Sequence, residues 1–193
     1  MTPDEIAQHL TNLFSNTVTE LEPGSWQVEA PDFRLLVLLS DDRSWIRALV
    51  PIAAAQDAQP YLEQLLEANF DDTQQTHYAL QEGALWGVFQ HRCASLTPED
   101  FEAALQRLQH LRHQGLDECF NRLVESRIRL IIQVAKLNGQ SLETTLQTLD
   151  RFYEEGVMGE IDAGSEQKEQ TLAAWRRQLE RLWHEPGNET SGP

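Results

Sequence analysis

Apolar residues between Phe33 and Pro51 form two runs around a short polar cluster. The runs are Phe33–Leu39 and Trp45–Val50, and the cluster between them is Ser40–Arg43. Runs of this length, rich in Leu, Val, Ile and aromatic residues and separated by turn-forming residues, predict a β-hairpin. The first run is apolar at nearly every position, which is typical of a strand at the centre of a sheet.

Two other segments show strand patterns. Thr76–Gln81 and Leu85–His91 flank Glu82-Gly83, and Gly83 can adopt the positive φ that a tight hairpin turn requires. Gly87 inside the second of these strands indicates a bulge or a close approach of backbones. Upstream, apolar and polar residues alternate over Ser25–Glu29, which predicts a short, half-exposed strand that we expect at an edge of the sheet.

Helices are predicted before, between and after these strands. Thr2-Pro3 and Thr97-Pro98 are each followed by two acids, the pattern of an N-cap with proline in the first turn. A third helix is predicted over Ala53–Phe70, with its effective start near Asp57 because Pro60 belongs in a first turn. The expected buried residues of these three helices are Ile6, Leu10, Leu13 and Phe14; Tyr61, Leu62, Leu65, Leu66 and Phe70; and Phe101, Leu105, Leu108 and Leu111.

The remainder of the chain is predicted to be helical. Helices are expected over Leu116–Leu137, from Ser141 through Tyr153, and over Ser165–Trp183, with a loop at 156–164. Their predicted apolar stripes are Leu116, Phe120, Leu123, Val124, Ile128, Ile131 and Val134; Leu142, Leu146, Leu149 and Phe152; and Leu172, Trp175, Leu179, Leu182 and Trp183. The predicted organisation is an α+β domain over residues 1–114, a helical extension over 115–185 and a disordered tail over 186–193.

The charge excludes some partners. The 193 residues carry a formal net charge of −16, and Lys136 and Lys168 are the only lysines. Binding to nucleic acid or to anionic membranes needs clustered Lys and Arg, so neither is expected. The N-terminus has no signal-peptide pattern and no apolar run is long enough to span a membrane, so we expect a cytoplasmic protein. Cys93 and Cys119 show no metal-binding spacing and are expected to be free thiols.

No short motif indicates an enzyme, a metal site or a cofactor, so none is predicted. His110, His113 and Asp117 would share a helix face, but Gly115 interrupts that helix. A pocket between sheet and helices, lined by His77, His91 and Cys93, is the alternative that would make the protein a small-molecule binder or an enzyme.

The aromatic residues of the strands are the main candidates for a binding surface. Trp26, Trp45 and Trp86 all fall in predicted strands, where they are either core residues or an apolar platform on the sheet face that the helices leave open. Arg34, Arg47 and Arg92 lie in the same strands and could accept acidic groups of a partner. The predicted partner-binding residues are Trp26, Trp45, Trp86, Arg34 and Arg47.

The predicted order is helix, three strands, helix, two strands, helix, followed by the helical extension. This order, together with the hairpins FRLLVLLSDDRSWIRALVP and THYALQEGALWGVFQHR and the acidic balance, resembles the type III secretion chaperone-like fold, which includes YbjN-like proteins. The resemblance covers about the first 60% of the chain. It implies a small antiparallel sheet backed by helices, and a non-enzymatic, cytoplasmic, usually dimeric protein that holds a partner polypeptide.

The functional prediction is therefore a chaperone or assembly adaptor that binds a protein client and forms a homodimer. The Gln- and Leu-rich, Lys-poor composition is similar to that of cyanobacterial proteins, which adds the hypothesis of a photosynthetic or carbon-fixing assembly. Besides the pocket described above, a second alternative is a structural subunit of a larger complex that uses the C-terminal helices as its interface.

Overall fold

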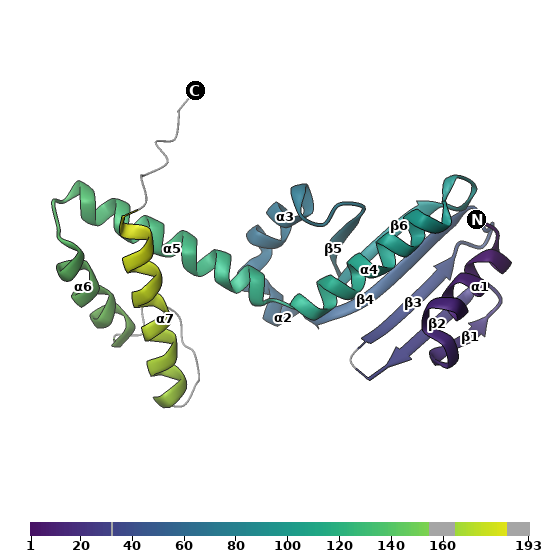
Figure 1. The fold of residues 1–193 in the computed structure, drawn as a ribbon, viewed down its shortest axis with the longest axis horizontal. Coiled ribbons are helices and arrows are strands. Elements are labelled where there is room, and N and C mark those ends of the chain that lie inside the picture. Colours follow the sequence, from purple (N-terminus) through teal and green to yellow (C-terminus); the bar gives the residue numbers. More distant parts are fainter. Residues whose placement is uncertain (32, 155–164, 185–193) are drawn as a thin grey trace, which may run out of the picture. The chain divides into compact units, whose positions relative to one another are not determined.

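The computed structural model describes residues 1–31, 33–154 and 165–184 (Figure 1). The chain divides into two compact units, Met1–Phe120 and Asn121–Pro193. The predicted loop at 156–164 and the predicted disordered tail at 186–193 lie outside the described residues, and so do the side chains of Phe152 and Leu172.

A mixed sheet-and-helix unit forms the first part of the chain, which confirms the α+β prediction. Among its described residues, six strands form one antiparallel sheet in the order β1-β2-β3-β4-β6-β5. The strands are β1 (Val18–Glu22), β2 (Ser25–Ala30), β3 (Phe33–Leu39), β4 (Trp45–Ala54), β5 (Thr76–Gln81) and β6 (Ala84–Arg92).

Both predicted hairpins are present. In the β3–β4 turn, the Asp42 carboxylate accepts hydrogen bonds from the Ser40 hydroxyl (2.6 Å) and from the backbone N–H of Ser44 (3.1 Å). In the β5–β6 turn, Glu82 and Gly83 both have positive φ, at 49° and 76°. Two consecutive positive φ values match the right-handed twist of paired strands, which explains the glycine at this position.

The strand β1 was not predicted from the sequence. It pairs with β2, so that β2 lies between β1 and β3 and the prediction that Ser25–Glu29 is an edge was wrong. Four of the five residues of β1 are exposed, and the register between β1 and β2 shifts between Glu20 and Glu22. A short polar edge strand with a bulge has no clear alternation of apolar residues, which is why the pattern did not reveal it.

The segment after Pro51 also differs from the prediction of a helix over Ala53–Phe70. The strand β4 continues through Pro51 to Ala54, with a register shift between Pro51 and Ala53. Helix α2 (Ala55–Ala58), the 3₁₀ turn η2 (Gln59–Tyr61) and α3 (Leu62–Asp71) then follow. Pro60 lies in the 3₁₀ turn, because its ring and missing N–H are incompatible with the interior of an α-helix.

The two capped helices start where the sequence predicts. In α1 (Pro3–Phe14), the Thr2 hydroxyl accepts from the Glu5 N–H, and the Glu5 carboxylate accepts from the Thr2 N–H at 2.7 Å, a complete capping box. In α4 (Pro98–Gln114), the Thr97 hydroxyl accepts from the Asp100 N–H at 3.1 Å. Both helices pack on the same face of the sheet (Figure 1).

The core of the first unit lies between this sheet face and the helices. At its centre Gly87 faces α4, and a Cβ at this position would lie 2.9 Å from Val50 Cγ2 and 3.3 Å from Leu108 Cδ2. The atoms that crowd Gly87 belong to side chains and not to another backbone, and the register shift of the β4–β6 pair lies between Pro51 and Ala53. The largest fully buried side chains are Ile6, Leu10, Leu35, Ile46, Leu85, Phe89, Phe101, Leu105, Leu108 and Leu111.

The second unit is built from α5 (Asp117–Leu137, which begins in the first unit), α6 (Leu142–Glu154) and α7 (Ser165–Trp183). Its core contains Ile128, Ile132, Leu149, Trp175, Leu179 and Leu182. The predicted stripe of α5 was partly wrong. Phe120 and Val134 are 36% and 50% exposed, whereas Ile132 and Ala135 are buried. The helix has apolar residues on more than one side, so periodicity alone could not identify the packed side.

Candidate functional site

Strand register assigns each residue of the sheet to one of its two faces. Trp26 lies opposite Val37, which lies opposite Ala48, and all three side chains are buried on the face that packs against the helices. Trp26 is only 3% exposed. It is therefore a core residue, the alternative that the sequence left open, and it does not share a face with Trp45.

The opposite side of the central strands, called the open face below, presents a different set of residues. It combines apolar side chains with arginines, and most of these side chains are exposed or half-buried; Val88, at 5% exposure, is the exception. The open face consists of Arg34, Leu36, Leu38, Trp45, Arg47, Leu49, Pro51, Trp86, Val88, Gln90 and Arg92. Four of the five predicted partner-binding residues lie on it: Trp45, Trp86, Arg34 and Arg47.

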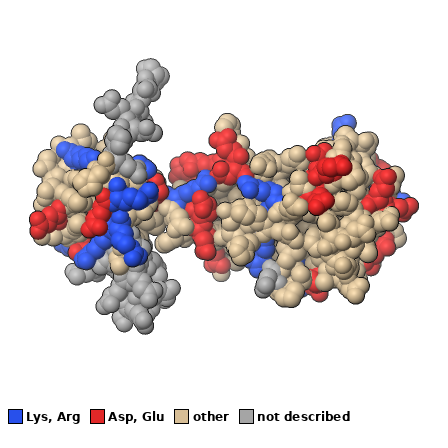
Figure 2. Space-filling view, viewed as in Figure 1, with Lys and Arg blue, Asp and Glu red and all other residues tan. Residues whose placement is uncertain are grey.

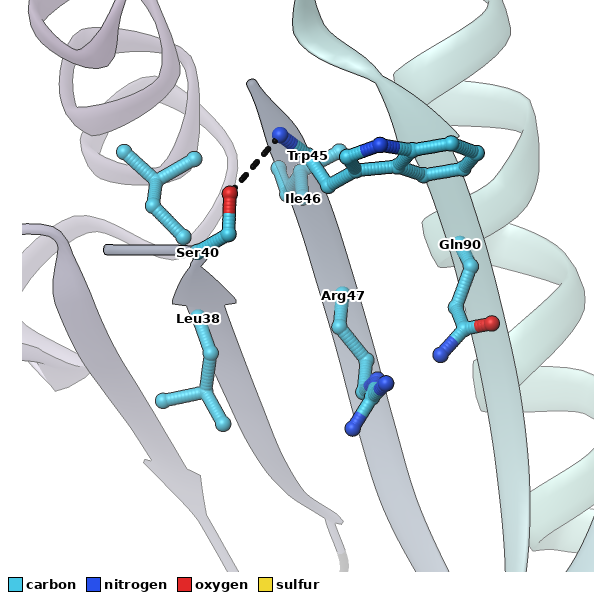
Figure 3. Close-up of a pocket in the computed structure, with 7 residues that line it drawn as sticks. Leu38, Ser40, Trp45, Ile46, Arg47 and Gln90 are labelled. Atoms are coloured by element: carbon cyan, nitrogen blue, oxygen red, sulfur yellow. Dashed lines mark hydrogen bonds between the residues drawn. The ribbon is translucent and has the colours of Figure 1, made fainter. Parts of the chain in front are cut away.

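Trp45 is the most exposed tryptophan that the structure describes on the open face, at 45%. The Arg92 guanidinium lies over its ring, with Cζ 5.5 Å from the ring centroid. Next to it is a hollow of about 500 Å³, whose lining includes Leu38, Trp45, Arg47 and Gln90. Figure 3 shows these side chains projecting from three neighbouring strands. A large aromatic group beside an open hollow is the usual form of a protein-binding anchor.

A polar group lies beside this hollow. With its amide oxygen turned toward β4, Gln90 accepts hydrogen bonds from Arg47 Nε (2.5 Å) and from one terminal nitrogen of the same guanidinium (2.6 Å). The partial burial of His77 on β5, together with the positive charge of Arg47, lowers the pKa of this histidine. His77 is therefore neutral at pH 7, and the guanidinium of Arg47 carries the positive charge here.

The open face is basic within an acidic unit. Residues 1–120 contain six Lys and Arg against nineteen Asp and Glu, a formal charge of −13, and three of the six cations lie on the open face. Arg34 pairs with Glu29 of β2 at 2.6 Å, but both side chains are more than half exposed. Figure 2 shows acidic groups spread over the visible face of this unit. The open face therefore suits a partner that combines apolar and acidic side chains.

The two edges of the sheet differ in their free hydrogen-bonding groups. On β5, the Asn69 amide of α3 donates to the Tyr78 carbonyl (3.2 Å) and accepts from the Tyr78 N–H (2.7 Å). This side chain occupies the position that a neighbouring strand would take. At the other edge, β1 is exposed at four of its five residues.

Apolar residues are also exposed away from the sheet. Leu66 and Phe70 of α3 are 69% and 88% exposed, so the prediction that they are buried was wrong; Leu65 and Ala68 face the core instead. On α5, Leu130, Val134 and Leu137 are 61%, 50% and 79% exposed. Their spacing of four and three residues places them on one side of the helix. The sequence indicates that these positions are apolar but not which of them are buried by other parts of the fold.

The structure does not bring together the residues of the predicted alternative pocket. His77 lies opposite Val88 on the open face, whereas His91 lies opposite Ile46 on the helix-covered face. Cys93 is buried in the 3₁₀ turn η3 (Cys93–Ser95), and burial raises the pKa of its thiol. A raised pKa keeps the thiol protonated at pH 7, so these residues do not form an activated nucleophile.

Within 1–31, 33–154 and 165–184, no cluster of three or more His, Cys, Asp and Glu side chains is suited to hold a metal ion. In the same part of the chain, none of the helices combines the length and apolar character needed to cross a membrane.

Sequence comparison links the first unit to a known family. The family model of the Tir chaperone protein (CesT) matches residues 7–114, more than half of the chain. No curated protein sequence matches the chain significantly. The matched region contains the sheet and α4, and ends before the second unit begins.

Several solved structures are similar to part of the chain. One is the ExoU–SpcU complex from the type III secretion system of Pseudomonas aeruginosa, with 13% identity, a TM-score of 0.47, and coverage of 58% of this chain and 95% of that one. A second is the Yersinia pestis secretion chaperone SycH with a fragment of YscM2, with 13% identity, a TM-score of 0.47, and coverage of 58% and 98%. A third is the HopA1–SchA chaperone–effector complex, with 12% identity, a TM-score of 0.46, and coverage of 57% and 88%.

Proposed function

This chain belongs to the Tir chaperone protein (CesT) family, and we propose that it is a non-enzymatic, cytoplasmic chaperone or assembly adaptor that binds a client polypeptide on the open face of its first unit. The observation that carries the proposal is Trp45, 45% exposed beside a hollow of about 500 Å³ on that face. Covering such a surface with a partner removes apolar area from water, at roughly 25 cal/mol per Å² before the entropic cost of association.

The client segment that fits this face combines apolar residues with carboxylates. The apolar side chains would cover Leu38 and Trp45, and the carboxylates would pair with Arg47 and Arg92. Arg92 already lies over the Trp45 ring, so an incoming carboxylate would meet a guanidinium held in place. Since three of the six cations of this unit lie here, the long-range field of the acidic surface would direct acidic segments toward this face rather than elsewhere.

A client strand could also extend the sheet, and we propose β1 as the edge that it would join. Asn69 already satisfies the Tyr78 backbone groups on β5, which removes that site of pairing from the opposite edge. The acids Glu20 and Glu22 of β1 would oppose pairing between two copies of this edge through like-charge repulsion.

Homodimer formation is a separate part of the proposal, supported by α3. Leu66 and Phe70 lie four residues apart on one side of this helix, at 69% and 88% exposure. Two large apolar side chains at such exposure are costly to leave in water, and a second copy of the same surface would bury both pairs at once.

The second unit supports a further candidate function, as an interface within a larger assembly. Leu130, Val134 and Leu137 form an exposed apolar stripe on α5, with the four-three spacing that pairs one helix with another. In this reading a helix of a partner subunit would cover the stripe, and substitution of Leu130 and Val134 by Ser would release the chain from that assembly. Retention of the same assembly by the double variant would contradict this candidate.

Affinity capture from the native cell extract, followed by mass spectrometry, tests the main proposal. The wild type is compared with a Trp45→Ala, Leu38→Ser double variant, and Leu13→Ser serves as the control for an exposed apolar residue on the helix side of the sheet. We expect one client or complex to be captured by the wild type and the control and lost with the double variant. Equal recovery by all three proteins would contradict the proposal, and the identity of a recovered client would test the photosynthetic or carbon-fixing hypothesis.

A further inference from the structure

A second hollow of the first unit, distinct from the one beside Trp45, lies where α4 ends near the start of β3. Its volume is about 650 Å³. One part of its lining is apolar, from Ala30, Pro31, Phe33 and Pro51, and the other part is formed by Arg34, Arg112 and His113. Two guanidinium groups and an imidazole therefore line one cavity in a unit whose formal charge is −13.

Among the described residues, Arg34 is the one basic side chain of this cavity that pairs with an acid. Within the described residues, Arg112 and His113 make no hydrogen bond and no ion pair, although both are at the end of a well-formed helix. Arg34 is paired with Glu29, but the Glu29 carboxylate is 55% exposed and can be displaced by a competing anion. Arg112 and His113 lie in the last turn of α4, where the helix dipole favours cations. The guanidinium groups of Arg34 and Arg112 therefore face a cavity that an anion can enter.

The apolar wall of the cavity is fixed in position. The Phe33 ring stacks on Phe14 of α1 with a centroid distance of 5.9 Å and an interplanar angle of 27°. Prolines 31 and 51 add rigid apolar surface, because their rings restrict the backbone. A ligand here would place a charged group against the cations and an uncharged, apolar body against Phe33.

We propose that this cavity is an oxyanion-binding site, which takes a carboxylate or phosphate group on a molecule with an apolar part. Arg34 and Arg112 supply planar guanidinium forks, which match carboxylate and phosphate oxygens in bidentate geometry. The group could be presented by an acidic peptide segment or by a free small anion. Arg34 and Pro51 also belong to the open face, whereas Arg112 and His113 belong to α4 and do not. Substitution of the two α4 residues therefore changes this site and leaves the residues of the open face unchanged.

Isothermal titration calorimetry on the full chain tests this site with three probes: inorganic phosphate, citrate, and the peptide acetyl-Phe-Glu-Glu. The wild type is compared with an Arg112→Gln, His113→Gln double variant, and Arg43→Gln, which removes a cation from the β3–β4 turn outside the cavity, is the matched control. Loss of the Arg112 guanidinium and of the His113 imidazole is expected to weaken binding by about tenfold or more, with Arg43→Gln unchanged.

The probes also separate the sources of the anion. Tighter binding of the peptide than of citrate and phosphate would identify an acidic polypeptide, and the reverse order would identify a free anion; either result supports the site. No binding of any probe at millimolar concentration, or equal binding to the correctly folded double variant, would overturn it. Client capture through Trp45 is measured separately, so failure of one proposal does not imply failure of the other.

Discussion

Arg92 and Trp45 face each other across the β4–β6 ladder, and the guanidinium carbon lies 5.5 Å from the centre of the indole. The pair holds a large aromatic surface in one orientation on a side of the sheet where most side chains are exposed or half-buried. A cation over an exposed indole contributes about 0.5–1 kcal/mol to stability, so the pair does little for folding. Its position beside the hollow is the basis of the proposal that Trp45 contacts a client.

The tryptophans of β2 and β4 should therefore differ sharply in their effect on folding. Trp26→Ala is expected to reduce the free energy of unfolding by about 3–5 kcal/mol, because a large side chain is removed from a packed core. Trp45→Ala should reduce it by less than about 1 kcal/mol. Urea denaturation followed by circular dichroism measures both values. Similar losses for the two variants would contradict the assignment of Trp45 to the open face.

Gly87 should not tolerate a larger residue. Gly87→Ala introduces a Cβ 2.9 Å from Val50 Cγ2, and overpacking of this kind costs about 1–3 kcal/mol. In a Val50→Ala background the crowding methyl group is absent, so the same substitution should be less costly there. A double-mutant cycle measured by denaturation tests this coupling. Independent, additive effects of the two substitutions would show that the close approach is not responsible.

Asn69 should contribute to stability through the two backbone groups that it satisfies. Asn69→Ala leaves the Tyr78 N–H and C=O without these partners, and the expected loss is about 1–3 kcal/mol. Asn69→Asp keeps the acceptor and loses the donor, so the stability of this variant should lie between that of the wild type and that of Asn69→Ala. Thermal unfolding of the three proteins gives the order. If Asn69→Ala is as stable as the wild type, water replaces the amide at the Tyr78 backbone groups without a cost in stability.

Asp42 predicts a specific pH dependence of folding. Hydrogen bonds from Ser40 and Ser44 lower the pKa of this carboxyl to about 2, below its ordinary value of 3.8. Because the folded state binds the proton less tightly, the contribution of Asp42 to stability is complete above pH 3.8 and is lost as the pH falls toward 2. The difference in Tm between wild type and Asp42→Asn should therefore be constant from pH 5 to 7 and shrink below pH 4.

A matched control separates this effect from general acid unfolding. Asp41→Asn removes the neighbouring carboxylate, whose side chain makes no hydrogen bond with the described residues. Its Tm should follow that of the wild type between pH 2 and 4. A difference for Asp42→Asn that stays constant down to pH 2 would show that hydrogen bonding in the turn does not lower the pKa of this group.

The surface of α3 makes a prediction about oligomeric state. If Leu66 and Phe70 are covered by a second copy, light scattering coupled to size-exclusion chromatography should give twice the monomer mass of 22.1 kDa. Phe70→Glu should give the monomer, because an unpaired charge in an apolar interface is strongly unfavourable. Leu130→Glu on α5 is the control and should leave the dimer intact. A monomeric wild type, or a dimer lost only with Leu130→Glu, would contradict the role of α3.

The parts of the fold that were predicted correctly have strong local signals. The starts of α1 and α4 follow from Thr-Pro pairs followed by acids, and both hairpins follow from apolar runs around Asp- or Gly-containing turns. These features depend on residues close in sequence, so local physical chemistry determines them. The strand β1 was missed because its five residues lie at an exposed edge, where few positions need to be apolar.

The errors about burial have a common origin. Residues such as Leu66, Phe70 and Val134 were assigned to the core because they are apolar and helically spaced, but the helices that carry them have apolar residues on more than one side. Trp26 and Trp45 pose the same problem in the sheet, where alternation separates two faces without showing which one the helices cover. That choice depends on contacts between distant segments, which a single sequence does not reveal.

The binding affinity of the recovered client for this chain tests the central claim most directly. Calorimetry would compare wild type with Trp45→Ala, after circular dichroism has established that the variant is folded, and with the Leu13→Ser control. A client that binds on the open face should lose about thirtyfold or more in affinity with Trp45→Ala, as for an anchor residue at the centre of an interface, and retain it with Leu13→Ser. An unchanged affinity with Trp45→Ala would show that the client binds elsewhere.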